Sequence, residues 1–205
     1  MKVLLINGSP NADGCTARAL KEVAVTLNNE GIETETIHVG NQNIRGCIAC
    51  GKCYESGKCV FDDLVNVVAD KLEAADGLVV GSPVYYASAN GTLISFLDRL
   101  FFSSRCDKRM KVGAAVVSAR RGGNTATFDQ LNKYFTISSM PVVSSQYWNQ
   151  VHGSCKEDVE KDLEGLQIMR TLGRNMAFLI KSIQLGKEAY GLPEKEKRVS
   201  TNFID

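Results

Sequence analysis

Short apolar runs recur along the chain, and between them apolar residues fall at the spacing of amphipathic helices. Residues 3–6, 77–81 and 111–117 are mainly apolar runs bounded by turn residues, which is typical of strands buried on both faces of a sheet. Residues 32–39 alternate charged or threonine residues with other types, which predicts a strand at or near a sheet edge. Residues 141–145 are expected to form a short final strand.

A predicted helix follows each of these strands. Apolar residues three and four positions apart place the helices at residues 16–27, 62–72, 91–102, 125–135 and about 157–185. Strands alternating with helices predict an α/β protein whose parallel sheet is covered on both faces. Since the second strand is polar and the first, third and fourth are apolar, we expect a flavodoxin-like three-layer sandwich with five parallel strands in the order 2-1-3-4-5. Residues 1–205 are interpreted as one such domain, with a cysteine-rich insertion at about 44–60.

Composition narrows the classes of function. The chain of 205 residues has 24 Lys and Arg against 23 Asp and Glu, so its net charge of +1 indicates neither a nucleic-acid partner nor an anionic membrane surface. No apolar run approaches the roughly 20 residues of a membrane span, and no secretory signal pattern is visible. Seven cysteines without an export signal predict a reducing cytoplasm, where clustered thiols bind metals or take part in redox chemistry.

The loop after the first strand predicts a phosphate site. Residues 7–14 are rich in Gly, Ser, Pro, Asn and Asp, and a helix starts directly after them. The unpaired N–H groups and positive dipole end of that helix favour an anion, and Ser9, Asn11 and Thr16 add neutral donors. No Lys or Arg precedes Arg18 in this loop, so we expect neutral groups to hold the phosphate. The Walker and dinucleotide glycine patterns do not match, and the alternative is a strand-to-helix turn without a ligand.

Two further loops are expected to meet the first at the same sheet edge. Residues 83–86 place two tyrosines after the third strand, and residues 118–124 place two arginines and two glycines after the fourth. Ligands of parallel α/β sheets lie beyond the carboxyl ends of the strands, so these loops should share one site. A phosphate site beside a site for a flat aromatic group describes FMN, with an arginine near the electron-rich end of the flavin. Ordinary aromatic packing and solvated loop charges are the alternatives.

The loops after the first and third strands resemble those of the NADPH-dependent FMN reductase family, through the motifs Asn7-Gly8-Ser9-Pro10, Gly14-Cys15-Thr16 and Gly81-Ser82-Pro83-Val84-Tyr85. The resemblance covers about residues 1–145 and implies FMN as cofactor, NAD(P)H as electron donor, and a homodimer or homotetramer. It implies that the phosphate binds at Ser9, Asn11, Cys15, Thr16 and Ala17. It also implies that the flavin ring contacts Pro83, Val84, Tyr85, Tyr86, Ser118, Ala119, Arg120, Gly122 and Gly123.

Four cysteines lie in one segment with the spacing C-x2-C-x2-C-x5-C: Cys47, Cys50, Cys53 and Cys59. Thiolates separated by two residues can converge on one cluster when the backbone coils tightly, and nearby glycines ease that coiling. The spacing resembles that of the iron–sulfur flavoprotein branch of the same family, which implies a 4Fe-4S cluster. A zinc ion and a loop without metal are the alternatives. Because the segment follows the second strand, we expect it beside the flavin loops.

Together these features predict an FMN-dependent oxidoreductase that takes hydride from NADH or NADPH and passes electrons to a flavin, a quinone or a protein. Hydride transfer to a flavin needs no side-chain acid or base, so no catalytic residue is assigned, and His38 and His152 are expected to be structural or exposed. Cys106 and Cys155 are isolated and are interpreted as packing residues or chance thiols. The alternatives are an FMN electron-transfer module that uses NAD(P)H poorly and a protein that keeps the fold without FMN.

Overall fold

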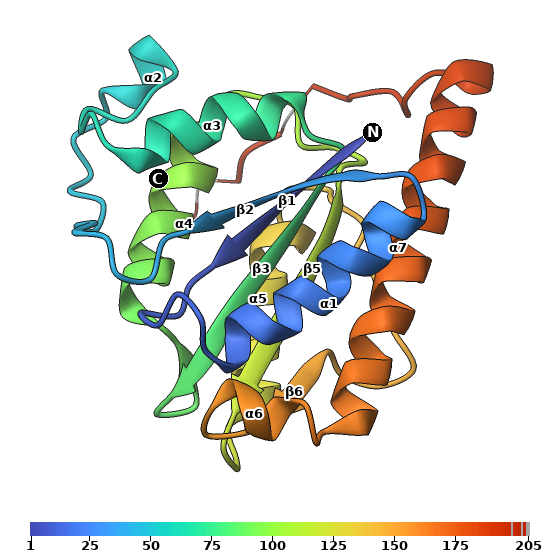
Figure 1. Ribbon diagram of the computed structural model, residues 1–205. Coiled ribbons are helices and arrows are strands. Elements are labelled where there is room, and N and C mark those ends of the chain that lie inside the picture. Colours follow the sequence, from blue (N-terminus) through green and yellow to red (C-terminus); the bar gives the residue numbers. More distant parts are fainter. Residues whose placement is uncertain (198, 202, 204–205) are drawn as a thin grey trace.

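The computed structural model describes residues 1–197, 199–201 and 203, and Figure 1 shows a twisted sheet between two layers of helices. Over these residues the sheet has six strands: five are parallel in the order β2-β1-β3-β5-β6, and β4 pairs antiparallel with the end of β3. The strands are β1 (Lys2–Asn7), β2 (Glu33–His38), β3 (Gly77–Tyr85), β4 (Ser88–Ala89), β5 (Val112–Ala119) and β6 (Gln150–His152). Apart from β4, this arrangement confirms the predicted flavodoxin-like order of five parallel strands.

The position of each strand follows from its polarity. Beyond Lys2, β1 is buried on both faces, and all residues of β5 are buried, as expected for continuous apolar runs inside a parallel sheet. β2 forms an edge, and its Glu and Thr side chains are exposed or half-buried. Lys2 covers part of this edge by pairing with Glu33 at 3.2 Å and Glu35 at 2.8 Å. The polar strand thus lies where its side chains can reach solvent.

The final strand is not where the sequence pattern predicts it. Residues 141–145, expected to form this strand, pair with β5 through one isolated bridge, between Val142 and Gly113. The strand itself is β6, which pairs with the last three residues of β5. Of its three residues only Val151 is fully buried, so β6 is too short and too polar to show a strand pattern in the sequence.

Two layers of helices cover the sheet. One layer, with its own apolar core, contains α1 (Cys15–Asn29), α6 (Lys156–Val159) and α7 (Leu163–Tyr190). The other contains α3 (Leu64–Ala74), α4 (Gly91–Ser103) and α5 (Asn124–Thr136). The one-turn helix α2 (Cys53–Ser56) projects outside both layers, at the upper left of Figure 1.

The predicted C-terminal helix is divided into α6 and α7. Asp162 lies at the break and caps α7, because its side chain accepts a hydrogen bond of 2.9 Å from the N–H of Gly165. α7 then packs closely along α1. A Cβ atom at Gly173 would lie 2.8 Å from Cβ of Thr26, so a larger residue there would push the two helices apart.

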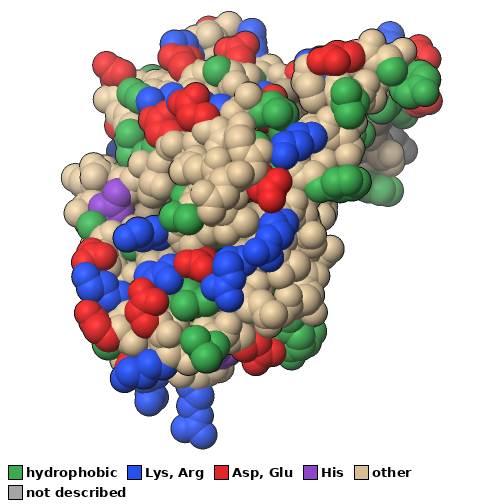
Figure 2. Space-filling view, turned by 45° about the vertical axis from the view of Figure 1, so that its right-hand side comes forward, with side chains coloured by type: hydrophobic (Ala, Val, Ile, Leu, Met, Phe, Trp, Pro, Cys, Tyr) green, Lys and Arg blue, Asp and Glu red, His purple; other side chains and the backbone are tan. Residues whose placement is uncertain are grey.

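The outer surface of this layer has mixed charge. Figure 2 shows Lys and Arg side chains interspersed with Asp and Glu, and only scattered hydrophobic side chains, on the face turned toward the viewer. Glu22 of α1 joins two such pairs, with Arg18 at 2.9 Å and Arg170 at 2.6 Å. In the part of the chain that the structure describes, no helix has the length and apolar character needed to cross a bilayer.

Candidate functional site

A cavity of about 520 Å³ opens at the carboxyl ends of the strands. We call it the loop cavity, because its walls come from the last residues of β3 and β5 and from the loops that follow β1, β5 and β6. Its lining residues are Ser9, Asn11, Asp13, Gly14, Cys15, Thr16, Pro83, Val84, Ser118, Ala119, Arg120, Gly153, Ser154, Cys155, Lys156 and Glu157. The volume is within the range of roughly 300–1,000 Å³ that small-molecule sites occupy.

The loop after β1 is held by a chain of short local hydrogen bonds. The side chain of Asn7 accepts from the N–H of Ser9 at 3.0 Å, and the hydroxyl of Ser9 accepts from the N–H of Asn11 at 3.2 Å. Asn11 in turn accepts from the N–H of Asp13 at 3.1 Å. The imidazole Nε2 of His38 lies 2.7 Å from the carbonyl oxygen of Ser9, which gives His38 the structural role expected of it. The loop is therefore shaped before any ligand binds.

The start of α1 provides unpaired donors at the bottom of this loop. Gly14 is the N-cap residue, and among the described residues no side chain caps the first N–H groups of the helix, so they can bind a ligand. The positive end of the helix dipole adds to their attraction for an anion. Gly14, Cys15 and Thr16 all line the cavity.

Two buried hydroxyl groups join opposite walls of the cavity. The hydroxyls of Thr16 and Ser118 share a hydrogen bond of 2.7 Å, which connects the start of α1 to the end of β5. Both side chains are almost fully buried, with exposed fractions of 1% and 4%. The sequence predicts both residues for the site, and the structure brings them into contact.

The part of the cavity expected to face a flavin ring is only partly as predicted. Pro83, Val84, Ala119 and Arg120 line it, which leaves an apolar wall beside one cation. Four residues expected to contact the flavin ring do not line the cavity: Tyr85, Tyr86, Gly122 and Gly123. Ala17, expected to contact the phosphate, does not line it either. Tyr86 is fully exposed, and its positive φ of 51° turns its side chain out of the loop.

Gly123 nevertheless shapes this wall. Its φ is +93°, and a Cβ atom there would lie 2.9 Å from Cα of Ala87 and from a methyl group of Val84. Only glycine fits both the backbone angle and the close approach of the two loops. Gly123 thus lets the loops after β3 and β5 pack against each other behind the cavity.

The fourth wall was missed by the sequence analysis. It is formed by residues 153–157, which follow β6 and include the start of α6. The N–H of Gly153 donates to the carbonyl of Ala119 at 3.1 Å, which extends the pairing of β6 with β5 to the cavity edge. Cys155, interpreted above as an isolated thiol, lines the same cavity as Cys15. The sequence analysis missed this wall because it did not predict β6, whose pairing with β5 brings residues 153–157 to the cavity.

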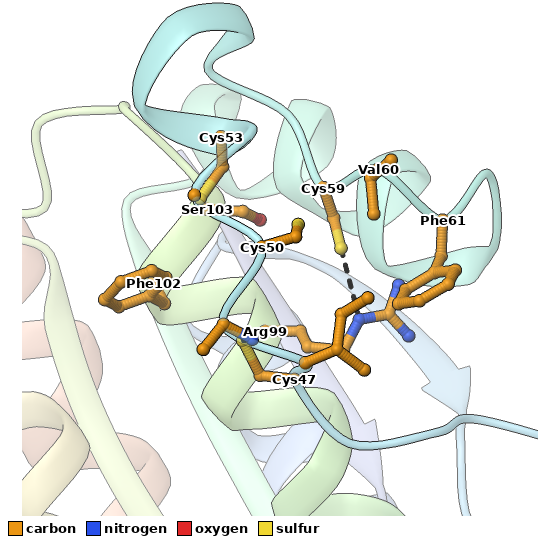
Figure 3. Close-up of a pocket in the computed structure, with 12 residues that line it drawn as sticks. Cys47, Cys50, Cys53, Cys59, Val60, Phe61, Arg99, Phe102 and Ser103 are labelled. Carbon is orange, nitrogen blue, oxygen red and sulfur yellow. Dashed lines mark hydrogen bonds between the residues drawn. The ribbon is translucent and has the colours of Figure 1, made fainter.

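The four clustered cysteines line a second, much smaller pocket, which we call the cysteine pocket (Figure 3). Its volume is about 20 Å³, room for roughly one water molecule. Over the described residues, no three Cys, His, Asp or Glu side chains converge closely enough to hold a metal ion. The buried hydroxyl of Ser103, in the wall of this pocket, has no hydrogen-bond partner among the described residues. The four thiols of this segment thus line one pocket, but they are not arranged to coordinate a metal ion.

Arg99 of α4 organises the inner side of the cysteine pocket. Its side chain is 1% exposed, and Nε donates to the sulfur of Cys59 at 3.2 Å, the dashed line in Figure 3. The two terminal nitrogens donate to the carboxylate of Asp63 at 2.7 and 3.0 Å. The guanidinium also lies 5.0 Å from the ring centroid of Phe61. A fixed positive charge therefore lies beside one of the four thiols.

The cysteine pocket and the loop cavity are separate pockets, and the expected position of the cysteines beside the flavin stays a prediction. The two share no lining residue. In Figure 1, α2 lies at the upper left, while α6 and β6 lie at the bottom. The cysteine pocket lies against the carboxyl-terminal half of α4, which contributes Arg99, Phe102 and Ser103 to its lining.

The chain is similar to flavin proteins over most of its length. A family profile described as NADPH-dependent FMN reductase matches residues 1–153. The iron-sulfur flavoprotein MJ1083 of Methanocaldococcus jannaschii is 36% identical over 196 residues, which cover 90% of this chain and 100% of that protein. The FMN reductase (NADPH) of Escherichia coli (strain K12) is 28% identical over 126 residues, which cover 62% of this chain and 59% of that protein.

Solved structures confirm the fold. RosB, with a bound 8-demethyl-8-formylriboflavin-5'-phosphate intermediate, superposes with a TM-score of 0.71 at 15% identity and covers 100% of this chain and 92% of its own. A flavodoxin from the domain Archaea gives a TM-score of 0.59 at 17% identity, covering 88% of this chain and 99% of its own. The likeness in three dimensions extends over nearly the whole molecule despite the low sequence identity.

Proposed function

Because this chain belongs to the NADPH-dependent FMN reductase family, whose members are FMN-binding oxidoreductases, we propose that it holds FMN in the loop cavity and uses it to pass electrons from NADH or NADPH to a flavin, a quinone or a protein. The observation that carries this proposal is that three segments selected from the sequence as FMN contacts line one cavity: the loop after β1, the end of β3, and the end of β5 with Arg120.

The donor set of the cavity fits the two ends of FMN. The free N–H groups at the start of α1, with the hydroxyls of Ser9 and Thr16, suit a phosphate. Pro83 and Val84 give an apolar surface for a flat ring, and Arg120 can stabilise negative charge on its reduced form. When bound, FMN supplies the hydride-accepting chemistry. The role of the protein is to orient the ring and keep one face open to the nucleotide.

The proposal is tested by mixing the FMN complex anaerobically with NADPH and, separately, with NADH in a stopped-flow spectrometer. Rapid loss of flavin absorbance with at least one nucleotide is the expected result. Slow loss with both nucleotides, together with rapid reduction by a reduced protein donor, would support an electron-transfer module instead. Failure of the protein to bind FMN would overturn both possibilities.

The cysteine pocket favours one elaboration of this function. We propose that Cys47, Cys50, Cys53 and Cys59 bind a 4Fe-4S cluster, supported by their common pocket and by the iron-sulfur flavoproteins among the relatives. Among the described residues no three of these thiols converge on one metal position, so loading requires the coil that carries Cys47 and Cys50 to move. Both of these cysteines are exposed, which leaves their segment room to rearrange.

An iron and acid-labile sulfide assay on anaerobically prepared protein, made with cluster-assembly support, tests this second proposal. Cys50→Ser should remove most of the iron and leave FMN bound, whereas the control Cys106→Ser, which changes a thiol outside the pocket, should retain both. Less than about one iron per chain in the unmodified protein would exclude the cluster. Stoichiometric zinc in its place would identify the alternative metal.

A further inference from the structure

A lysine far from the first loop in the sequence adds a positive charge to the loop cavity. The loop after β1 has no Lys or Arg of its own, but Lys156, the first residue of α6, lines the cavity beside it. The ammonium group of Lys156 contacts the carboxylate of Asp13, which belongs to that loop. The pair joins two segments separated by 143 positions in the sequence.

The charges around the cavity give this lysine a place beside a bound anion. Four charged residues line the cavity: the acids Asp13 and Glu157, and the cations Arg120 and Lys156. Arg120 follows β5 and lies at the end assigned to the flavin ring, whereas Lys156 contacts the loop assigned to the phosphate. Without Lys156, a phosphate carrying about two negative charges would enter a loop whose nearest charged side chain is the carboxylate of Asp13.

The fold holds Lys156 in this place. β6 pairs with the end of β5, and the N–H of Gly153 continues that pairing with a bond of 3.1 Å to Ala119. One turn after Lys156, Glu160 accepts a hydrogen bond of 3.1 Å from a terminal nitrogen of Arg18 on α1. The first turn of α6 is thus fixed from both sides against the start of α1.

We propose that Lys156 is a phosphate-binding residue, and that its ammonium group moves from Asp13 to the phosphate, or bridges the two, when FMN binds. This inference rests on the proposed FMN function and adds a residue to the phosphate site. An ammonium group has three donors, so it can serve both anions at once. The side chains of Lys156 and Asp13 are 44% and 76% exposed, so both can turn toward a ligand. A lysine is a cation at neutral pH, and pairing with Asp13 raises the pKa of Lys156 further.

The test compares FMN with riboflavin, which has the same ring and ribityl chain but no phosphate. Quenching of flavin fluorescence gives the dissociation constant of each ligand for the protein and its variants at low salt. Lys156→Gln should weaken FMN binding about five- to twentyfold and leave riboflavin binding unchanged, because the lost contact is a partly screened charge-assisted hydrogen bond. Lys156→Arg, which keeps the charge, should restore most of the affinity.

Two further variants sharpen the test. Lys161→Gln removes another lysine from the same region, which is 80% exposed and does not line the cavity, and should change neither constant. Asp13→Asn should strengthen FMN binding about two- to fivefold, because it frees the lysine and removes a repulsive carboxylate. Equal losses for FMN and riboflavin in Lys156→Gln, or an unchanged FMN constant, would overturn the assignment. Absence of FMN binding by the unmodified protein would instead overturn the proposed function and this inference with it.

Discussion

The loop cavity and the cysteine pocket differ in what holds their residues in place. Each wall of the loop cavity lies at or after the end of a strand, and internal hydrogen bonds such as that between Thr16 and Ser118 fix the walls relative to one another. All four cysteines lie on irregular coil or on the one-turn helix α2, and one of them, Cys59, accepts a hydrogen bond from Arg99.

This difference indicates that the loop cavity forms as the chain folds, whereas the cysteine pocket needs its ligand to become ordered. Small-molecule sites in α/β proteins are usually formed in advance, because strand ends and helix starts supply their geometry. Metal sites made of thiolates are often completed only by the metal, whose binding energy offsets the cost of ordering the coil. The size of the cavity, about 520 Å³ against about 20 Å³, is consistent with this contrast.

The largest expected effect comes from removing Arg99, the buried cation of the cysteine pocket. Arg99→Met removes the ion-pair partner of the Asp63 carboxylate and the cation that lies over the ring of Phe61. Because Arg99 is 1% exposed and Asp63 is 27% exposed, the free energy of unfolding should fall by about 2–4 kcal/mol, as measured by urea denaturation. Arg105→Met, at an exposed position near the same segment, should change it by less than about 0.5 kcal/mol.

The same variant tests whether the two regions are independent. At a temperature where Arg99→Met remains folded, its dissociation constant for FMN should match that of the unmodified protein, because the two pockets share no residue. A large loss of FMN affinity in folded protein would show that the cysteine pocket supports the cavity through α4.

The second prediction concerns the hydrogen bond across the loop cavity. If the hydroxyl of Ser118 donates to Thr16, then Thr16 keeps its own proton for the phosphate. Thr16→Val removes that donor and should weaken FMN binding about tenfold, whereas Ser118→Ala leaves it in place and should weaken binding by no more than about threefold. Fluorescence titration measures both. Equal effects of the two substitutions would assign the phosphate donor to the pair instead of to Thr16.

The sequence predicts the loop cavity well because its main walls depend on local patterns. The apolar runs that become β1, β3 and β5 are buried on both faces, so their order and direction follow, and the loops at their ends must meet. The wall that contains Lys156 escapes prediction because β6 is a strand only through its pairing with β5. Its three residues carry no periodicity of their own.

The place of the cysteine segment could not be predicted for a related reason. Arg99 of α4 contacts both Cys59 of this segment and Asp63, the N-cap residue of α3, which lies 36 positions away in the sequence. Nothing in the spacing of the cysteines specifies which helix the coil follows. Sequence patterns report which groups have suitable chemistry, whereas contacts of this kind decide where those groups lie.

The smallest expected effect compares thiols of the two regions directly. Burial raises the pKa of Cys15, so at pH 8 a smaller fraction of its thiol is ionised than at an unburied cysteine. In iron-free protein, iodoacetamide should therefore modify Cys15 several-fold more slowly than the exposed Cys47 and Cys50, with the rate at Cys15 increasing as the pH rises further. FMN should slow the reaction at Cys15 and Cys155, which line the cavity, and leave Cys47 and Cys50 unaffected. Mass spectrometry of peptides after timed alkylation measures all four rates. Protection of Cys47 or Cys50 by FMN would mean that the two regions are coupled or that the cofactor binds at the cysteine pocket.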